Sequence, residues 1–408
     1  MKVGLLSPGW PRSAFANGIV SSVECLIEPL QAAGIEPCVL AWEGQAGSAH
    51  EFVRVIAPLE PSRGLGRLPN KLRWSLAPGR TARASFVRRF DADVMRAGRS
   101  LDVIESEESF GWTAGLDKRT RPALVLTLHG PWLVHGSFAG QSAIAGPFRD
   151  RVRAEGNGLR RADLLIAPSR DVLDKSRHYY RLDGLPTVVI PYAMPVQARE
   201  ARWKLEECSL DDLLFVGRFD RHKGGDTVID AFAQAAQKLP SLRLTFAGPD
   251  RGLQDREGRA WSLPAFVEHR LPGAVERGQV RLLGQCTPAQ LEPLRLKALA
   301  TLSCSRWENL SLAAMEALAT GCPLIAADRG GISEHIQHGR NGMLFEAGNA
   351  ERLAECILKL RRDPARAAVM GSAAADTVQE QFDPYRIALR RVDAYRRALA
   401  ARDGGSSS

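Results

Sequence analysis

Short apolar runs alternate with amphipathic helical stretches along most of this 408-residue chain. The runs in the first half that read as strands are Val3–Ser7, Pro37–Trp42, Val53–Ala57, Leu101–Glu105, Leu124–His129, Leu164–Pro168 and Val188–Tyr192. A second set follows at Leu213–Gly217, Leu242–Gly248, Val280–Gly284, Ala300–Ser303 and Pro323–Ala327. Strand–helix alternation requires right-handed crossovers and produces parallel sheets. The sequence therefore predicts an α/β protein with two doubly wound domains.

A polar and charged stretch within residues 193–211 separates the two sets of strands. One strand-like run ends at Tyr192 before it, and a new apolar run begins at Leu213 after it. Domain boundaries fall in exposed polar linkers of this kind. We therefore expect residues 1–195 to form an N-terminal domain and residues 196–382 a C-terminal domain. A long arginine-rich helix is expected over residues 383–402.

Composition and cysteine usage favour a cytoplasmic protein. Hydrophobic residues make up 45% of the chain and charged residues 25%, as in ordinary globular domains. No apolar run approaches the ~20 residues that span a bilayer, and a strand begins at Lys2, where a signal peptide would otherwise stand. The seven cysteines are scattered without a C-x-x-C pair, which favours reduced thiols over disulfides or a zinc site.

The formal net charge of +9 is unevenly spread. Residues 61–90 carry basic side chains and no acidic one: Arg63, Arg67, Lys71, Arg73, Arg80, Arg83, Arg88 and Arg89. Two interpretations stay open, namely an arginine-rich solvated face and contact with an anionic membrane surface or a phosphate-bearing acceptor. The second would add peripheral attachment to the inner face of the membrane. No helix-turn-helix, zinc-finger or interleaved basic and aromatic pattern occurs, so nucleic acid is not an expected partner.

Residues 302–331 read as strand, loop, helix, glycine stop and strand. Glu308 stands in the loop, and Glu316 is the only charged residue of the Ala- and Leu-rich helix. A carboxylate in such a closely packed helix is costly unless it has a partner. Backbone N–H groups at the start of the helix are available to hold an anion. The segment therefore predicts a site that reads a sugar, a phosphate and a ribose.

Glu308 and Glu316, with seven residues between them, resemble the E-x7-E motif of the retaining nucleotide-sugar glycosyltransferases of glycosyltransferase family 4. Three further segments strengthen the resemblance: Gly217-Arg218 followed by Lys223-Gly224, Gly330-Gly331-x-x-Glu334, and Gly339-x-Asn341-Gly342. The resemblance is clear over residues 210–362 and weaker over residues 1–195. It implies the GT-B fold, in which two Rossmann-like domains face one another across a cleft. In that fold the final helix, here residues 383–402, packs back on the first domain.

The resemblance also implies roles for residues of the C-terminal domain. Arg218 and Lys223 would grip the donor diphosphate, because cations offset the charge that grows on a departing nucleoside diphosphate. Glu308 would contact the sugar hydroxyls and Glu316 the ribose hydroxyls. The other implied donor contacts are backbone N–H groups at Asn309, Leu310, Ser311 and Leu312. Ser311 also suits a helix N-cap, and a purely structural capping role stays open as the alternative to a donor contact.

In the N-terminal domain, His129 follows a strand at the position where the family often places a histidine beside the donor sugar. Asn17-Gly18 stands before the first helix in place of the family's paired glycines, and Gly18 is expected to let the backbone approach the diphosphate. Glu107 and Glu108 end another strand. They are expected to bind the acceptor, with a solvated strand end as the alternative.

Together these features predict an enzyme that moves a hexosyl unit from a nucleotide-diphospho-sugar to an acceptor hydroxyl, with retention as the resemblance implies. The acceptor would be a glycan, a lipid-linked molecule or a small molecule. The expected catalytic residues are His129, Arg218, Lys223 and Glu308, with no metal and no cofactor. Two alternatives stay open: a nucleotide-sugar 2-epimerase of the same fold, and a non-catalytic protein that binds sugar nucleotides. The donor base, the donor sugar and the acceptor are not specified by these motifs.

Overall fold

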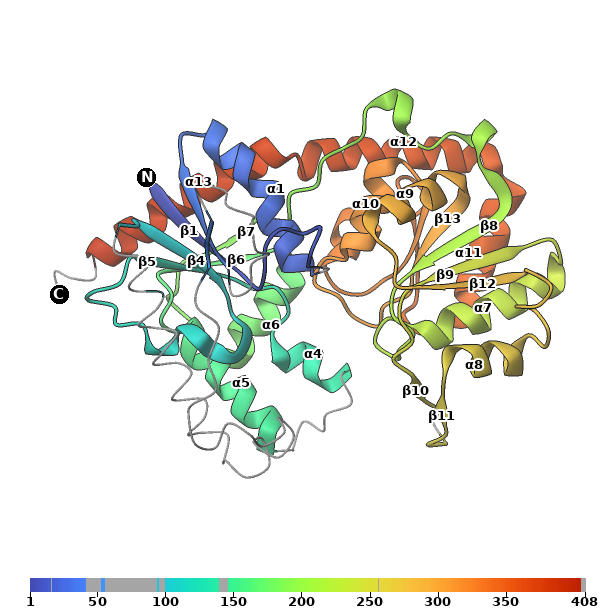
Figure 1. The fold of residues 1–408 in the computed structure, drawn as a ribbon, viewed down its shortest axis with the longest axis horizontal. Helices are drawn as coiled ribbons and strands as arrows, with labels where there is room; N and C mark the ends of the chain where they lie inside the picture. The colour runs from blue at the N-terminus through green and yellow to red at the C-terminus, as the bar shows by residue number, and fades with distance from the viewer. Residues whose placement is uncertain are drawn as a thin grey trace. The chain divides into compact units, whose positions relative to one another are not determined.

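The computed structural model describes residues 1–15, 17–41, 53–55, 94, 100–138, 146–255 and 257–404, without side chains for residues 53–55 and 404. The chain divides into two compact units (Figure 1). Unit 1 comprises Met1–Ala193 with Pro384–Ser408, and unit 2 comprises Met194–Asp383. The basic stretch at residues 61–90 lies outside the described residues, so its membrane interpretation stays a prediction.

The described part of unit 1 contains a seven-stranded parallel sheet in the order β3-β2-β1-β4-β5-β6-β7. Its strands are β1 (Lys2–Ser7), β2 (Glu36–Ala41), β3 (Val53–Val55), β4 (Val103–Glu107), β5 (Ala123–Thr127), β6 (Leu164–Ala167) and β7 (Thr187–Val189). Its helices are α1 (Gly18–Ala32), α4 (Trp132–Phe138), α5 (Gly146–Leu159), α6 (Arg170–Tyr180) and α13 (Pro384–Gly404), with the 3-10 segment η1 (Ser109–Gly115). Helices α1 and α13 cover one face of the sheet, and α5 and α6 cover the other (Figure 1).

Unit 2 contains a six-stranded parallel sheet in the order β12-β9-β8-β13-β14-β15. Its strands are β8 (Ser209–Val216), β9 (Arg243–Ala247), β12 (Val280–Gly284), β13 (Ala298–Ser303), β14 (Leu324–Ala327) and β15 (Met343–Phe345). A separate hairpin pairs β10 (Leu253–Gln254) with β11 (Ala260–Trp261). The helices are α7 (Gly225–Lys238), α8 (Leu263–Arg270), α9 (Pro288–Lys297), α10 (Leu312–Thr320), α11 (Ala350–Arg362) and α12 (Pro364–Gln381), with the 3-10 segment η4 (Gly331–His335).

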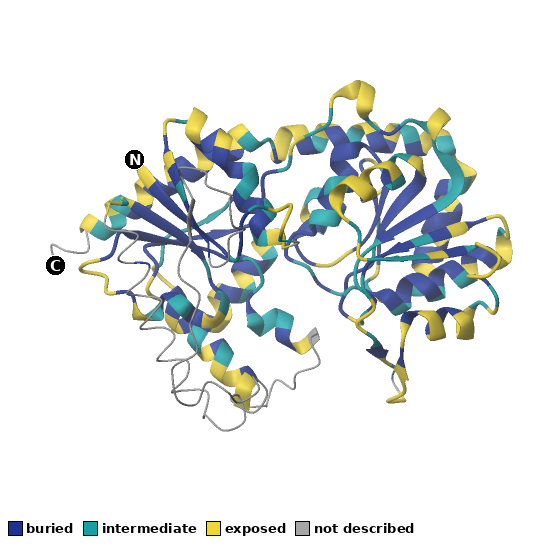
Figure 2. Ribbon diagram, in the orientation of Figure 1, coloured by how far each residue is buried: buried dark blue, intermediate teal, exposed yellow. Residues whose placement is uncertain are grey.

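These two sheets confirm the predicted α/β class with two doubly wound domains, and every expected strand has a counterpart in the structure. The inner strands β4, β5, β6, β13 and β14 are buried on both faces, as parallel sheets covered by helices require, whereas the edge strands β7 and β12 are partly exposed (Figure 2). The strand order reverses between β1 and β4 in unit 1, and between β8 and β13 in unit 2. Ligands of open α/β sheets bind outside the carboxyl ends of strands at such reversals.

Helix α13 belongs to unit 1 and is fastened to its sheet by a buried polar cluster. Glu105 on β4 accepts a hydrogen bond from the Tyr395 hydroxyl at 2.6 Å and one from the Thr127 hydroxyl at 2.6 Å. Arg391 forms an ion pair with the same carboxylate. Although burial alone would raise it, the pKa of Glu105 is lowered, chiefly because of the Arg391 charge. The cluster therefore ties the end of the chain to β4 and β5 with a charge pair as well as apolar contacts.

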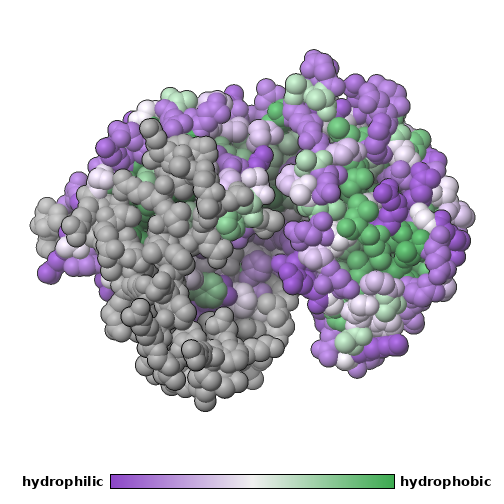
Figure 3. Space-filling view, viewed as in Figure 1, coloured by the Kyte–Doolittle hydropathy of each residue, from purple (hydrophilic) through white to green (hydrophobic). Residues whose placement is uncertain are grey.

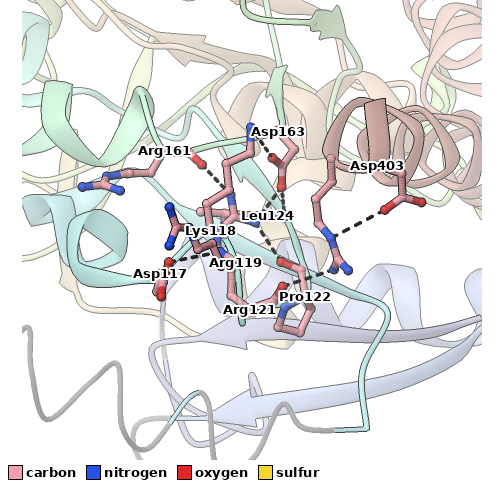
Figure 4. A network of polar contacts seen from close by, with 10 residues as sticks. Asp117, Lys118, Arg119, Arg121, Pro122, Leu124, Arg161, Asp163 and Asp403 are labelled. Carbon is pink, nitrogen blue, oxygen red and sulfur yellow. Dashed lines mark hydrogen bonds and ion pairs between the residues drawn. The ribbon is translucent and has the colours of Figure 1, made fainter. Parts of the chain in front are cut away.

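A second buried ion pair lies at the amino ends of β5 and β6 (Figure 4). Arg121 donates to Asp163 Oδ2 at 2.6 Å, and both side chains are fully buried. The backbone N–H of Leu124 donates to the same oxygen at 2.8 Å, and Arg121 also donates to the carbonyl of Arg161 at 2.7 Å. These bonds replace the hydrogen bonds to water that both charged groups lose on burial. Removing either partner alone would therefore lower the stability of the fold substantially.

The described helices include none that is long and apolar enough to cross a membrane. In the view of Figure 3, hydrophilic residues cover much of the described surface, and apolar residues gather over part of unit 2.

Candidate functional site

The loops that follow β8 and β13 carry the residues expected to bind the donor, and they flank the strand-order reversal of unit 2. Lys223, from the first loop, forms an ion pair with Glu308, from the second. Arg218 donates through Nε to Asp220 Oδ2 at 2.7 Å, while Asp220 Oδ1 accepts the backbone N–H of Lys223 at 2.7 Å. The structure therefore brings Lys223 and Glu308 together, and Asp220, which sequence reasoning missed, shapes the loop between the two cations.

Two glycines allow these loops to approach so closely. Gly224 has φ +74°, and an added Cβ would overlap the carbonyl oxygen of Cys304. Gly330 has φ +77°, and a Cβ there would overlap the carbonyl oxygen of Glu308. The neighbouring Gly331 N–H donates to that carbonyl at 3.0 Å. Only glycine satisfies both the positive φ and the close contact, which explains why residues 224 and 330 are glycine.

Further contacts lock the two loops to each other. The backbone N–H of Arg306 donates to the carbonyl of His222 at 2.8 Å, and His222 Nε2 lies 2.7 Å from the carbonyl of Trp307. The Arg306 guanidinium grips both carboxylate oxygens of Asp226 on α7, at 2.8 and 2.7 Å. Bidentate pairs of this kind fix orientation as well as charge. No motif assigned roles to His222 or Arg306, because their partners lie some eighty residues away in the sequence.

Burial changes the protonation of this site. It lowers the pKa of Lys223 to about 8, and the nearby Arg218 charge lowers it further while Asp220 opposes the shift. Burial likewise lowers the pKa of His222 to about 4, with Lys223 adding to the effect. His222 is therefore neutral at pH 7, and the positive charge offered at this edge of the sheet comes from Arg218 and Lys223.

Helix α10 begins as the sequence predicted. Ser311 is the N-cap, and its hydroxyl accepts the backbone N–H of Ala314 at 3.4 Å. Asn309, Leu310 and Ser311 are buried, and Leu312 is the first helical residue. The capping role of Ser311 is thus observed, whereas the donor contacts of these four residues stay a prediction.

Glu316 has the charged partner that its apolar helix requires. Arg295 of α9, which is almost completely buried, forms an ion pair with Glu316, whose side chain keeps 32% of its exposure. The carboxylate is therefore accessible from one side while Arg295 holds it from the other. Sequence reasoning did not find Arg295, because nothing in the helix Pro288–Lys297 marks one of its cations as buried.

In unit 1, the loop after β5 carries His129. The backbone N–H groups of His129 and Gly130 both donate to the Glu108 carboxylate at 2.8 Å. His129 Nδ1 lies 2.9 Å from the Tyr192 hydroxyl, and the two rings stack with centroids 5.3 Å apart. Burial, together with the Arg391 charge, lowers the pKa of His129 to about 4. A neutral imidazole is therefore held in a fixed orientation at the end of β5.

The position of Glu108 differs from the expectation that it binds the acceptor. Its side chain is buried and both carboxylate oxygens already accept N–H groups from the loop after β5. Burial raises the pKa of Glu108 to about 8, with the Glu155 charge adding to the shift. Glu107 is only partly buried; it accepts a hydrogen bond from Ser109 at 3.1 Å, and burial raises the pKa of its carboxyl. Glu107 thus stays a candidate acceptor residue, and Glu108 acts on the His129 loop.

Gly18 is the first residue of α1 and is exposed at the end of the loop after β1. Asn17 caps the helix by accepting the backbone N–H of Ile19 at 2.8 Å. The helix N-terminus therefore lies beside the strand-order reversal of unit 1, where Gly18 was expected to approach the diphosphate.

Family models match both halves of the chain. The model described as Glycosyltransferase Family 4 matches residues 16–197, and that of Glycosyl transferases group 1 matches residues 199–377. The chain is 26% identical to glycogen synthase of Mycobacterium tuberculosis over 99% of this chain and 96% of that protein. It is 30% identical to D-inositol 3-phosphate glycosyltransferase 1 of Catenulispora acidiphila over 70% of each chain.

Solved structures share the fold at low identity. Sucrose-phosphate synthase of Thermosynechococcus elongatus superimposes with a TM-score of 0.72 at 23% identity, covering 98% of this chain and 99% of the other. Anabaena HepE in complex with UDP-glucose gives a TM-score of 0.67 at 20% identity, covering 97% and 99% of the two chains. These matches agree with the GT-B fold that the motifs imply.

Proposed function

Because this chain is a glycosyltransferase that belongs to glycosyltransferase family 4, we propose that it transfers a hexosyl unit from a nucleotide-diphospho-sugar to an acceptor hydroxyl with retention. The observation that carries this proposal is the pairing of Lys223 with Glu308 at the strand-order reversal of unit 2. A phosphate-binding cation and a hydroxyl-binding carboxylate in contact suit the junction between a diphosphate and a sugar.

In the proposed mechanism the diphosphate is held by Arg218 and Lys223. Lys223 exchanges its ion pair with Glu308 for phosphate oxygens, which frees Glu308 to accept hydrogen bonds from sugar hydroxyls. The exchange conserves the number of charge contacts around Lys223 and releases a carboxylate that is 12% exposed. Backbone N–H groups at residues 309–312 and the start of α1 at Gly18 would add donors to the phosphates. Glu316, held by Arg295, would bind the ribose.

The acceptor hydroxyl attacks the anomeric carbon from the face that the diphosphate leaves. A new carbon–oxygen bond forms to the acceptor, the bond to the phosphate oxygen breaks, and the hydroxyl proton passes to that leaving oxygen. Arg218 and Lys223 stabilise the negative charge that develops on the leaving diphosphate. Electrostatic stabilisation of this kind usually contributes the largest part of the rate acceleration. Neutral His129 would donate or accept a hydrogen bond at the sugar. The scheme requires no metal, because these cations and helix N-termini contact the diphosphate.

The donor class can be tested without knowledge of the acceptor. The full-length protein would be heated with UDP, GDP, ADP or TDP, starting with UDP because HepE is described in complex with UDP-glucose. A nucleotide at about one hundred times its Kd stabilises the native state by about 2.7 kcal/mol and raises the Tm. We expect one nucleotide to do so, and Lys223→Met to abolish the effect. Lys204→Met is the matched control, since Lys204 pairs with Glu207 on the exposed surface of the same unit.

Two outcomes would count against the proposal. If none of the four nucleotides raises the Tm, the protein does not use these nucleotide-sugar donors. If the Tm of the Lys223→Met variant rises as much as that of the wild type, Lys223 does not bind the diphosphate. With the donor sugar of the stabilising nucleotide in hand, incubation without acceptor then separates a transferase from a 2-epimerase. An epimerase would convert the whole donor to a free product, whereas a transferase would only hydrolyse it slowly.

A further inference from the structure

The guanidinium of Arg151 on α5 lies over two aromatic rings in unit 1. Its guanidinium carbon is 3.7 Å from the centroid of the Phe110 ring and 3.6 Å from that of the Trp132 ring. Its Nε donates to Glu155 Oε1 at 3.0 Å. Within the described residues its two terminal nitrogens have no protein partner, and 20% of the side chain is exposed. The guanidinium thus packs against both rings, while its terminal nitrogens can still donate hydrogen bonds.

Glu155 holds Phe110, Trp132 and Arg151 in place. Its carboxylate is fully buried and accepts the backbone N–H of Trp132 at 2.7 Å and that of Phe110 at 3.3 Å, besides the bond from Arg151. The hydroxyl of Tyr180 lies 3.4 Å away. One carboxylate therefore fixes both aromatic residues and the arginine between them. The mechanism proposed above gives Glu155 no part in the chemistry.

The backbone at Phe110 is strained in a way that serves this arrangement. Phe110 has φ +57°, which is rare for a residue with a side chain, and the residue as a whole is 40% exposed. The next residue, Gly111, has φ +62° and packs so closely on the carbonyl of Ala154 that a Cβ would overlap it. Strain of this kind persists where the surroundings enforce it, and it is concentrated at binding sites.

The platform formed by Phe110, Arg151 and Glu107 lies where unit 1 is expected to bind a substrate. Glu107 ends β4, Phe110 follows it in η1, and Trp132 follows β5 three residues after His129. These are the carboxyl ends of neighbouring parallel strands, beside the reversal of strand order. One Glu107 oxygen accepts from Ser109, and the other has no partner among the described residues.

We propose that this platform binds a pyranose ring of the acceptor, which deepens the proposed function by naming a carbohydrate as the acceptor class. An exposed aromatic ring covers the apolar face of a sugar, while a guanidinium edge donates to its hydroxyls and a carboxylate accepts from them. A phosphate is disfavoured. Arg151 is already paired with Glu155, so its charge is largely neutralised and it attracts an anion only weakly.

The test is saturation-transfer NMR on the full-length protein with four probes: the methyl pyranosides of glucose, galactose and mannose, and inositol 1-phosphate. The variants are Phe110→Gly, which keeps the left-handed backbone while removing the ring, and Arg151→Lys, which keeps the charge without the planar fork. Tyr179→Ala is the control, since Tyr179 is an exposed ring of unit 1 outside the platform, 53% exposed. Melting curves of each variant verify folding.

We expect at least one pyranoside to bind, and each platform variant to weaken it about fivefold, in line with the energy of a stacked aromatic contact. The control should bind as the wild type does. The inference is overturned if no pyranoside binds, if only inositol 1-phosphate binds, or if folded Phe110→Gly and Arg151→Lys bind the sugar unchanged. The rise in Tm with nucleotide tests Lys223, which belongs to unit 2, in the same full-length protein. Failure of the sugar platform therefore leaves the proposed donor site intact, and failure of the donor site leaves the sugar platform intact.

Discussion

Replacing Lys223 by Met should destabilise the protein as well as remove the phosphate contact. Lys223 and Glu308 keep only 24% and 12% of their side-chain exposure, so the pair is between a surface bridge and a buried one. Surface bridges contribute about 0–1 kcal/mol, whereas leaving one member of a buried pair alone costs about 3–5 kcal/mol. We therefore expect a loss of about 2 kcal/mol, because Glu308 keeps its charge but loses its cation.

For a unit of this size, such a loss lowers the Tm by about 4–8 °C. The double variant Lys223→Met with Glu308→Gln should recover most of that shift, since a neutral amide tolerates burial without a cation. Differential scanning calorimetry at pH 7 measures both, and Lys204→Met should change the Tm by less than about 2 °C because its ion pair is exposed. An unchanged Tm in Lys223→Met, or a double variant no more stable than the single one, would refute the argument that Glu308 depends on Lys223.

Two further predictions concern stability. Burial lowers the pKa of His222 to about 4, so the unfolded chain binds the proton more readily; the stability that neutral His222 contributes should be fully present above about pH 6.5 and be lost as the pH falls to 4. Melting curves across this range should show a smaller loss in a His222→Gln variant, and an equal loss would contradict the assignment. Asp163→Ala should lower the free energy of unfolding by about 3–5 kcal/mol, because it leaves Arg121 buried and unpaired. Urea unfolding followed by circular dichroism measures this, and a loss below about 1 kcal/mol would show that Arg121 finds another partner.

The fold was accessible from the sequence because strands covered by helices on both faces must be apolar along their whole length. Runs such as Leu164–Pro168 and Pro323–Ala327 carry that signature and form β6 and β14. Strand β15 was missed, since three residues at Met343–Phe345 are too short to stand out. The hairpin of β10 and β11 was missed for the same reason.

The candidate site was accessible only in part. Lys223 and Glu308 could be singled out because each stands in a loop after an apolar strand and within a segment that resembles a family motif. The residues that hold Glu316 and the His129 loop in place could not be found in this way. Arg295 reaches Glu316, and Glu108 reaches the His129 loop, only after the chain has folded. A glutamate at a strand end has the same local sequence whether it faces solvent or binds backbone N–H groups. For Glu108 the position of β5 decides between these two.

The attachment of α13 to Glu105 has a consequence for how the protein is made. Unit 2 is one uninterrupted segment, whereas unit 1 needs residues from Pro384 onward. On the ribosome, the first half of the chain emerges with Glu105 lacking Arg391 and Tyr395, and with its sheet uncovered where α13 will pack. Unit 1 is therefore synthesised first but completed last. Unit 2 has all its residues while unit 1 still exposes the apolar surface that α13 will cover. Until the residues from Pro384 onward have emerged, unit 1 exposes apolar surface that a chaperone can protect.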